Sequence, residues 1–221
     1  MPQLIAMIIV VVGAMIYMFQ TFGGTGDKIE GIAQKTSIIT EINNIKNGVK
    51  LAARSNHIGV AGGTAVGGDA VANLSGLGTM NYFAQQINEQ LASAAALATP
   101  VVNNYNAISF GGAHDSATPA MRIQLVTNLA NRVPGIYVEF GGLLTDSGGF
   151  LEAQIATDLA SIARVDRHAT SAVATAGAWG ATGTDARIPG ETAAPAAGNT
   201  ANDGRFIIYF NDFAANEIVL P

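Results

Sequence analysis

The chain contains no cysteine. Disulfide bonds, thiolate metal sites and a cysteine nucleophile are therefore excluded, and the sequence carries no information on the redox state of its compartment. Charged side chains make up only 12% of residues, and a net charge of -5 argues against a surface that binds polyanions. Aromatic residues are few and scattered among sparse basic ones. The sequence therefore predicts no nucleic-acid binding.

Charge is missing altogether from residues 1–26. Within them, residues 4–19 (LIAMIIVVVGAMIYMF) are apolar or small. With its flanks this run reaches about 21 residues, just enough to cross a hydrocarbon core of roughly 30 Å as a helix. A secretory signal peptide is the alternative, but it would have a basic start, a shorter apolar core and a small-residue cleavage site. A retained N-terminal anchor is favoured.

A second helical segment follows. Residues 22–26 (FGGTG) contain Gly23, Gly24 and Gly26, each of which lowers helix propensity by about 1 kcal/mol relative to alanine, so a hinge is predicted there. Asp27 is a suitable N-cap for the helix that resumes. Apolar residues then recur at steps of three and four, with Thr36 polar among them: Ile29, Ile32, Ile39, Ile42, Ile45, Val49, Ala52 and Ala53. This pattern predicts an amphipathic helix that packs one face on a globular head.

The remaining chain alternates helix-like and strand-like segments. Charge is unevenly spread along the chain. Residues 27–54 carry five basic and three acidic side chains and are mildly basic, whereas the whole chain, with 11 basic and 16 acidic side chains, is acidic. The fold class is predicted as α+β, with a long N-terminal helix packed on a mixed α/β head that contains an antiparallel or mixed sheet. We expect an apolar helix (1–26), a stalk helix (27–56) and a head (57–221). Within the head we expect a loop (55–79), helices (81–98, 118–133 and 150–164), strands (101–110, 136–140, 205–209 and 217–220) and an extended surface segment (170–204).

The residues that could carry chemistry do not form a recognisable set. His57, His114 and His168 lie in unrelated contexts, and no G-x-S-x-G elbow surrounds a serine. Asp203, Asn211 and Asp212 lack the spacing of a metal-binding loop, and no G-x-G-x-x-G follows a strand. We predict no enzymatic activity, no metal and no cofactor.

The order of these features resembles that of type IV pilins. An apolar N-terminal helix runs through a glycine-softened junction into an amphipathic one, ahead of a mixed helix-and-strand head. Residues 120–142 (AMRIQLVTNLANRVPGIYVEFGG), interpreted as a helix that feeds a strand ending in paired glycines, are similar to a segment of class IVb pilins. Residues 40–46 (TEINNIK) also fit that class. Class IVb includes toxin-coregulated pilins and the thin-pilus pilins of conjugative plasmids.

The resemblance implies a structural subunit of an extracellular filament. Such a subunit waits in the bacterial inner membrane, is extracted by pilus assembly machinery and polymerises with identical subunits through its N-terminal helix. The positions expected to pack in the filament core are Met1, Leu4, Ile5, Ile8, Ile9, Val12, Gly13, Ile16 and Phe19. Adhesion, motility, DNA transfer and secretion all use such filaments, and no residue selects among them.

Two departures from the class accompany the resemblance. Ile5 stands where the family carries Glu, which is thought to neutralise the terminal amine of a neighbouring subunit, and Gln3 offers only an amide oxygen. If Met1 is the processed start, a leader has already been removed, which would explain why no lysine precedes the apolar run. The C-terminal disulfide of the class is absent, so the apolar side chains near the C-terminus are expected to close the head: Phe206, Ile208, Phe210, Phe213, Ile218 and Leu220.

An alternative function remains open. The same sequence features suit a single-span anchored envelope domain that binds a partner, or a minor pilin or pseudopilin that does not form the filament body. The abundance of alanine, glycine and threonine favours lateral packing between copies, but only weakly.

Overall fold

The computed structural model describes residues 34–60, 71–95, 103–107, 119–126, 130, 132–172, 201–214 and 216–220. The candidate packing positions from Met1 to Phe19 and the hinge glycines Gly23, Gly24 and Gly26 lie outside these ranges. So do Ile29 and Ile32 of the predicted stripe. Within the described part of the chain, no helix is both long and apolar enough to cross a membrane.

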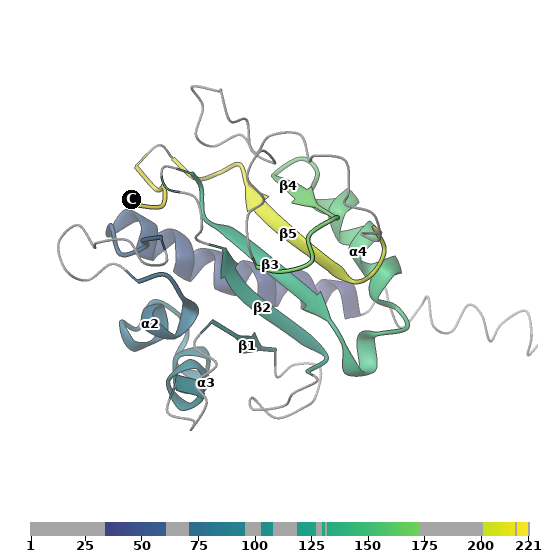
Figure 1. Cartoon of the computed structure of the whole chain (residues 1–221), viewed down its shortest axis with the longest axis horizontal. Coiled ribbons are helices and arrows are strands. Elements are labelled where there is room, and N and C mark those ends of the chain that lie inside the picture. The colour runs from purple at the N-terminus through teal and green to yellow at the C-terminus, as the bar shows by residue number, and fades with distance from the viewer. Residues whose placement is uncertain are drawn as a thin grey trace, which may run out of the picture.

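The centre of the fold is a five-stranded antiparallel sheet (Figure 1). Its strand order is β1-β2-β3-β5-β4, and the α+β class with an antiparallel sheet is confirmed. The strands are β1 (Tyr105–Asn106), β2 (Met121–Val126), β3 (Gly135–Phe140), β4 (Ala163–Asp166) and β5 (Arg205–Phe210). The helices are an N-terminal helix (residues 34–54), α2 (Leu74–Thr79), α3 (Gln85–Ala95) and α4 (Gly148–Leu159), with a short 3-10 turn η2 (Gly142–Leu144).

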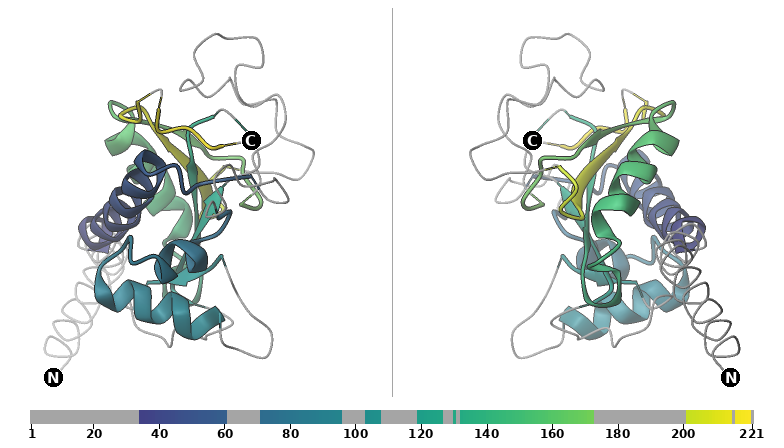
Figure 2. Two further views of the ribbon diagram at one scale, coloured as in Figure 1. Left: turned by 90° about the vertical axis from the view of Figure 1, so that its left-hand side faces the viewer. Right: turned by 90° about the vertical axis from the view of Figure 1, so that its right-hand side faces the viewer.

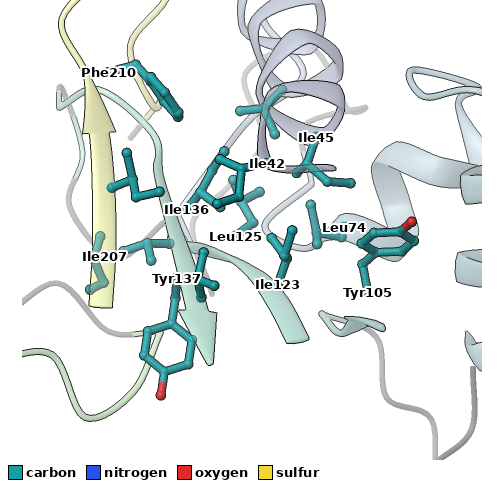
Figure 3. Packing of buried hydrophobic residues seen from close by; sticks show 14 of the residues in the cluster. Ile42, Ile45, Leu74, Tyr105, Ile123, Leu125, Ile136, Tyr137, Ile207 and Phe210 are labelled. Atoms are coloured by element: carbon teal, nitrogen blue, oxygen red, sulfur yellow. The ribbon is translucent and has the colours of Figure 1, made fainter. Parts of the chain in front are cut away.

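The N-terminal helix covers one face of the sheet. Its buried residues recur at the predicted three- and four-residue steps: Ile38, Ile42, Ile45, Val49, Ala52 and Ala53. Ile38 is fully buried whereas Ile39, the residue predicted for the stripe, is only half-buried. Ile42 and Ile45 point toward the strands (Figure 3), and α4 lies on the same side of the sheet (Figure 2). The predicted amphipathic helix is therefore present over the described residues.

Side chains of the central strands alternate between the two faces of the sheet. Met121, Ile123 and Leu125 of β2 are buried on the face toward the helices. Tyr137 of β3 points to the opposite side (Figure 3). On that outer face Arg122 Nη1 donates to Glu139 Oε2 at 3.0 Å across β2 and β3. The alternation gives the sheet an apolar inner face and a partly charged outer face.

The predicted helix over residues 118–133 is wrong. Residues 121–126 form β2 and pair with β3 through six partner positions. Met121 and Leu125 fit both a four-residue and a two-residue period, and the structure buries Ile123 between half-buried neighbours, as expected for a strand. Cross-strand pairing with β3 therefore outweighs the helical period of this segment. Residues 120–142 are therefore not a helix that feeds a strand, and this segment no longer supports the family resemblance.

Other boundaries also differ from the predictions. The helix expected over 150–164 is α4, which ends at Leu159. Residues 163–166 are not helical but form β4, which pairs with β5. Helix α2 lies inside the predicted loop 55–79. The predicted strand 217–220 is reduced to one bridge, between Gly59 and Leu220. Strands β3 and β5 and helix α3 fall where they were predicted.

Gly48, in the middle of the N-terminal helix, allows the segment before α3 to approach closely. A Cβ atom at this position would lie 2.7 Å from the carbonyl oxygen of Tyr82 and would overlap the ring of Phe83. A glycine here costs about 1 kcal/mol in helix propensity relative to alanine, and the contact with Phe83 offsets that cost.

We expect Gly48→Ala to destabilise the fold by about 2 kcal/mol, because the overlap outweighs the gain in helix propensity. Urea unfolding followed by circular dichroism measures the change. Asn47→Ala, at the neighbouring exposed position, is the control and should change stability by no more than about 0.5 kcal/mol. A Gly48→Ala variant as stable as the parent would contradict the close packing.

Candidate functional site

Charged side chains of the N-terminal helix turn toward the protein's own fold. Near its described start, Lys35 Nζ lies 2.7 Å from Asp158 Oδ2 of α4. Further along the helix, Glu41 Oε2 accepts a hydrogen bond of 3.1 Å from the Tyr105 hydroxyl of edge strand β1. Burial, followed by the Glu41 charge and hydrogen bond, raises the pKa of Tyr105, so this hydroxyl stays protonated and remains a donor. These contacts fix the helix against α4 and the edge of the sheet.

The second half of the helix binds the chain's C-terminal segment (residues 211–214 and 216–220). Lys46 Nζ and Lys50 Nζ lie 3.0 and 3.2 Å from Asp212 Oδ2, and Lys50 also donates to the Asp212 carbonyl at 2.7 Å. Lys46 Nζ is 4.8 Å from the centre of the Phe210 ring, and Lys50 Nζ is 5.7 Å from that of Phe213. Each lysine thus forms an ion pair with a carboxylate and a cation–π contact with an aromatic ring.

Glu217 is the buried member of this cluster, with 1% of its side chain exposed. One carboxylate oxygen accepts from Arg54 Nε, and the other accepts from the Ala214 amide at 2.8 Å. Lys50 Nζ lies 3.9 Å from the second oxygen. The carboxylate has two hydrogen-bond donors and a second cation nearby, which is the condition under which a buried charge is tolerated.

The surroundings hold both acids in their ionised form. Burial alone would raise the pKa of Asp212, but hydrogen bonds from Lys46 and Lys50 outweigh it and the pKa is lowered. Burial likewise opposes ionisation of Glu217, but the Ala214 amide, Arg54 and Lys50 together lower its pKa. A carboxyl group whose pKa is lower in the folded state stabilises the fold above its ordinary pKa and loses that contribution as the pH falls.

Backbone bonds complete the attachment of the C-terminal segment. The Leu220 amide donates to the Ile58 carbonyl at 2.9 Å, and the Val60 amide donates to the Leu220 carbonyl at 3.2 Å. The Val219 amide donates to the Arg132 carbonyl at 2.8 Å. Of the six apolar residues expected to close this region, four are buried and two are half-buried: Phe206, Ile208, Phe210 and Phe213, then Ile218 and Leu220. Closure is therefore partly apolar, as predicted, and partly ionic.

The outward face of the N-terminal helix presents almost no charge. Its exposed residues are Thr36 and, at steps of three and four, Ser37, Thr40, Asn44, Asn47, Leu51 and Arg54, followed by Ser55. Arg54 is the only charged member of this described set, and it binds Glu217. Leu51, with 53% of its surface exposed, is the large apolar side chain of this face. We call Ser37, Thr40, Asn44, Asn47 and Leu51 the outer stripe.

Glu152 of α4 forms a separate buried site beside the start of β5. Its side chain is fully buried and accepts from Arg167 Nε at 2.8 Å and from the amides of Asn202 and Gly204, both at 2.9 Å. Asn202 and Gly204 have positive φ angles, of 76° and 80°. A single carboxylate therefore joins Arg167, which follows β4, to the turn at residues 202–204 that enters β5.

Of the residues considered for catalysis and metal binding, those that the structure describes take part in structural contacts. The His57 ring is hydrogen-bonded to the Tyr82 hydroxyl and packs edge-on against its ring, while the His168 amide donates to Asp166. His114 lies outside the described residues. Asp203 is paired with Arg205 at 2.7 Å, and Asp212 binds the two lysines. Across the described ranges, no group of three or more His, Cys, Asp and Glu residues could hold a metal ion.

Comparisons with known proteins do not assign a family. No family model matches the chain, no curated protein matches it, and no solved structure matches it. Its function is therefore inferred from its own residues.

We expect Glu152→Gln to lower the free energy of unfolding by about 3 kcal/mol, because Arg167 and two amide donors would lose a buried carboxylate. Chemical denaturation provides the measurement. Glu89→Gln is the matched control, since Glu89 is an exposed helical acid bonded to Gln85, and it should cost no more than about 0.5 kcal/mol. Equal effects of the two substitutions would show that Glu152 does not organise this junction.

Proposed function

We propose that this chain is a structural pilin subunit that polymerises through its N-terminal helix into an extracellular type IV pilus-like filament. The outer stripe is the observation that carries this proposal. In the described helix, Lys35, Glu41, Lys46 and Lys50 all bind the protein's own fold. The face left outward bears hydroxyl, amide and leucine side chains.

An uncharged outer stripe suits a helix that other helices will cover. Surface helices of soluble domains usually carry charged residues on the solvent side. Charges at a covered interface must be desolvated, which costs several kcal/mol unless they are paired. Serine, threonine and asparagine avoid this cost and can bond across closely packed helices.

The first 26 residues, which carry no charge, support the same interpretation. In the proposed filament they continue the helix and pack among copies of themselves, with Gly13 allowing close approach and the hinge at Gly23, Gly24 and Gly26 letting the stalk extend. Burial of Leu4, Ile8 and Val12 would contribute about 1.5 to 3 kcal/mol each before entropy is counted. Before assembly the same segment would hold the subunit in the inner membrane of a bacterium, ready for the assembly machinery.

The ionic attachment of the C-terminal segment fits this role. A subunit that is extracted by its N-terminal helix needs that helix joined firmly to the rest of the chain. Lys46, Lys50 and Arg54 join it to Asp212 and Glu217 in a chain without cysteine. The role requires no enzymatic activity, cofactor, metal or nucleic acid.

The proposal predicts that sheared cell-surface material contains filaments made of this chain. Ile8→Asp should abolish them, because a carboxylate in the filament core has no partner, while the far-ultraviolet circular dichroism of the purified protein stays unchanged. Negative-stain microscopy with immunogold labelling is the measurement. Absence of the wild-type chain from any filament would favour the alternative of a single-span anchored binding domain, or a minor pilin or pseudopilin.

The outer stripe can be tested separately. Asn44→Glu places a charge at its centre and should reduce filament yield at least about tenfold, because the charge would be desolvated on assembly. Stability should change by no more than about 0.5 kcal/mol, since Asn44 is exposed. Gln86→Glu, an exposed substitution on α3 with the same change of charge, is the control. Normal filament yield from Asn44→Glu would show that the stripe faces solvent in the assembled protein.

A further inference from the structure

We propose that the C-terminal segment is an electrostatic latch, which releases from the N-terminal helix in acid or high salt while the sheet remains folded. This device is independent of the filament proposal, because it follows from contacts within one chain.

The latch is a compact set of contacts on one edge of the helix. Lys46, Lys50 and Arg54 are spaced four residues apart and so lie along the same side. Asp212 sits against the first two cations and Glu217 against the last two. Without the acids, the three cations would repel one another, since like charges at this spacing destabilise a helix. The acids therefore convert a repulsive edge into an attractive one.

The latch is separate from the hydrogen bonds of the sheet. Strand β5 ends at Phe210, and its ladders with β3 and β4 involve no residue beyond that point. The segment itself is held to the fold by Phe213, Val219 and the backbone bonds to Ile58, Val60 and Arg132. At its start, the Asn211 amide also donates to the Ile162 carbonyl at 2.8 Å, directly before β4. Opening the segment breaks these contacts and leaves all four strand pairings intact.

The pH window follows from the two carboxylates. The charged groups that face the two carboxylates are Lys46, Lys50 and Arg54 of the N-terminal helix. Strand β5 contributes the uncharged Phe210 ring, which packs on Lys46. The Arg132 carbonyl accepts from the Val219 amide, and the His57 ring binds Tyr82. The pKa values of Asp212 and Glu217 are both lowered in the folded state. The latch is therefore fully closed when the pH is above the ordinary carboxyl pKa, and it opens as the pH falls through the lowered pKa values. Asp212, with 44% of its side chain exposed, is also open to screening by salt.

Hydrogen exchange of the full chain in detergent micelles, read by mass spectrometry, tests the latch. At neutral pH, Asp212→Asn and Glu217→Gln should each speed exchange in residues 216–220 by about tenfold, with β3 and β5 unchanged. The wild type should show the same local change in acid, after correction for the intrinsic exchange rate, and a partial change in about 1 M salt. Asp158→Asn, which removes the Lys35 pair at the other end of the same helix, is the control and should leave residues 216–220 unchanged.

Two outcomes would overturn the proposal. Unchanged exchange in residues 216–220 of both variants would show that the ion pairs do not hold the segment. Equal acceleration in β3, β5 and residues 216–220 would show that the segment opens only with the whole fold. Asp212 is exposed, so its variant supports the test even if Glu217→Gln fails to fold.

Discussion

The packing of the N-terminal helix on the inner face of the sheet fixes the rotation of that helix, and the other features of the structure depend on this rotation. Ile42, Ile45 and Val49 are almost completely buried against the strands, so no other face of the helix can turn inward without exposing them. Once this angle is set, the cations lie along one edge, where they meet the C-terminal acids. Asn44 and Asn47 lie on the outward side of the helix, away from the sheet. This apolar contact thus decides which side chains of the helix bind the rest of the fold and which face outward.

Much of the fold could be predicted because its strongest signals are local. The stripe of isoleucines at three- and four-residue steps predicted the helix, and the short β-branched and aromatic runs predicted β3 and β5. Strand β2 was mistaken for a helix because Met121 and Leu125 fit both periods, and only the pairing with β3 decides between them. Helix α2 was missed because its sequence, LSGLGT, contains two glycines and is only six residues long. Local propensity is a weak guide where tertiary contacts decide.

The ionic cluster could not be predicted, because its partners are far apart in the chain. Lys46 and Asp212 are separated by 166 residues, and Glu152 binds Gly204 across 52. Sequence patterns report which side chains share a helix face, but they do not report which distant loop will come to rest beside it. The only available hint was the composition. In a chain with 12% charged residues and no cysteine, the few charged side chains were candidates for ion pairs that stabilise the fold. The apolar part of the closure was predictable, since its phenylalanines and isoleucines lie together near the C-terminus.

The junction at Glu152 also affects how the sequence can change with time. Strands β4 and β5 are neighbours in the sheet but are distant in the chain, and both ends of the intervening stretch are tied to one buried carboxylate. The entropy of closing a loop grows only slowly, by about 0.6 kcal/mol for each doubling of its length. By this relation alone, a change in the number of residues between β4 and β5 costs little, provided that the contacts of Glu152 with Arg167 and Gly204 are kept.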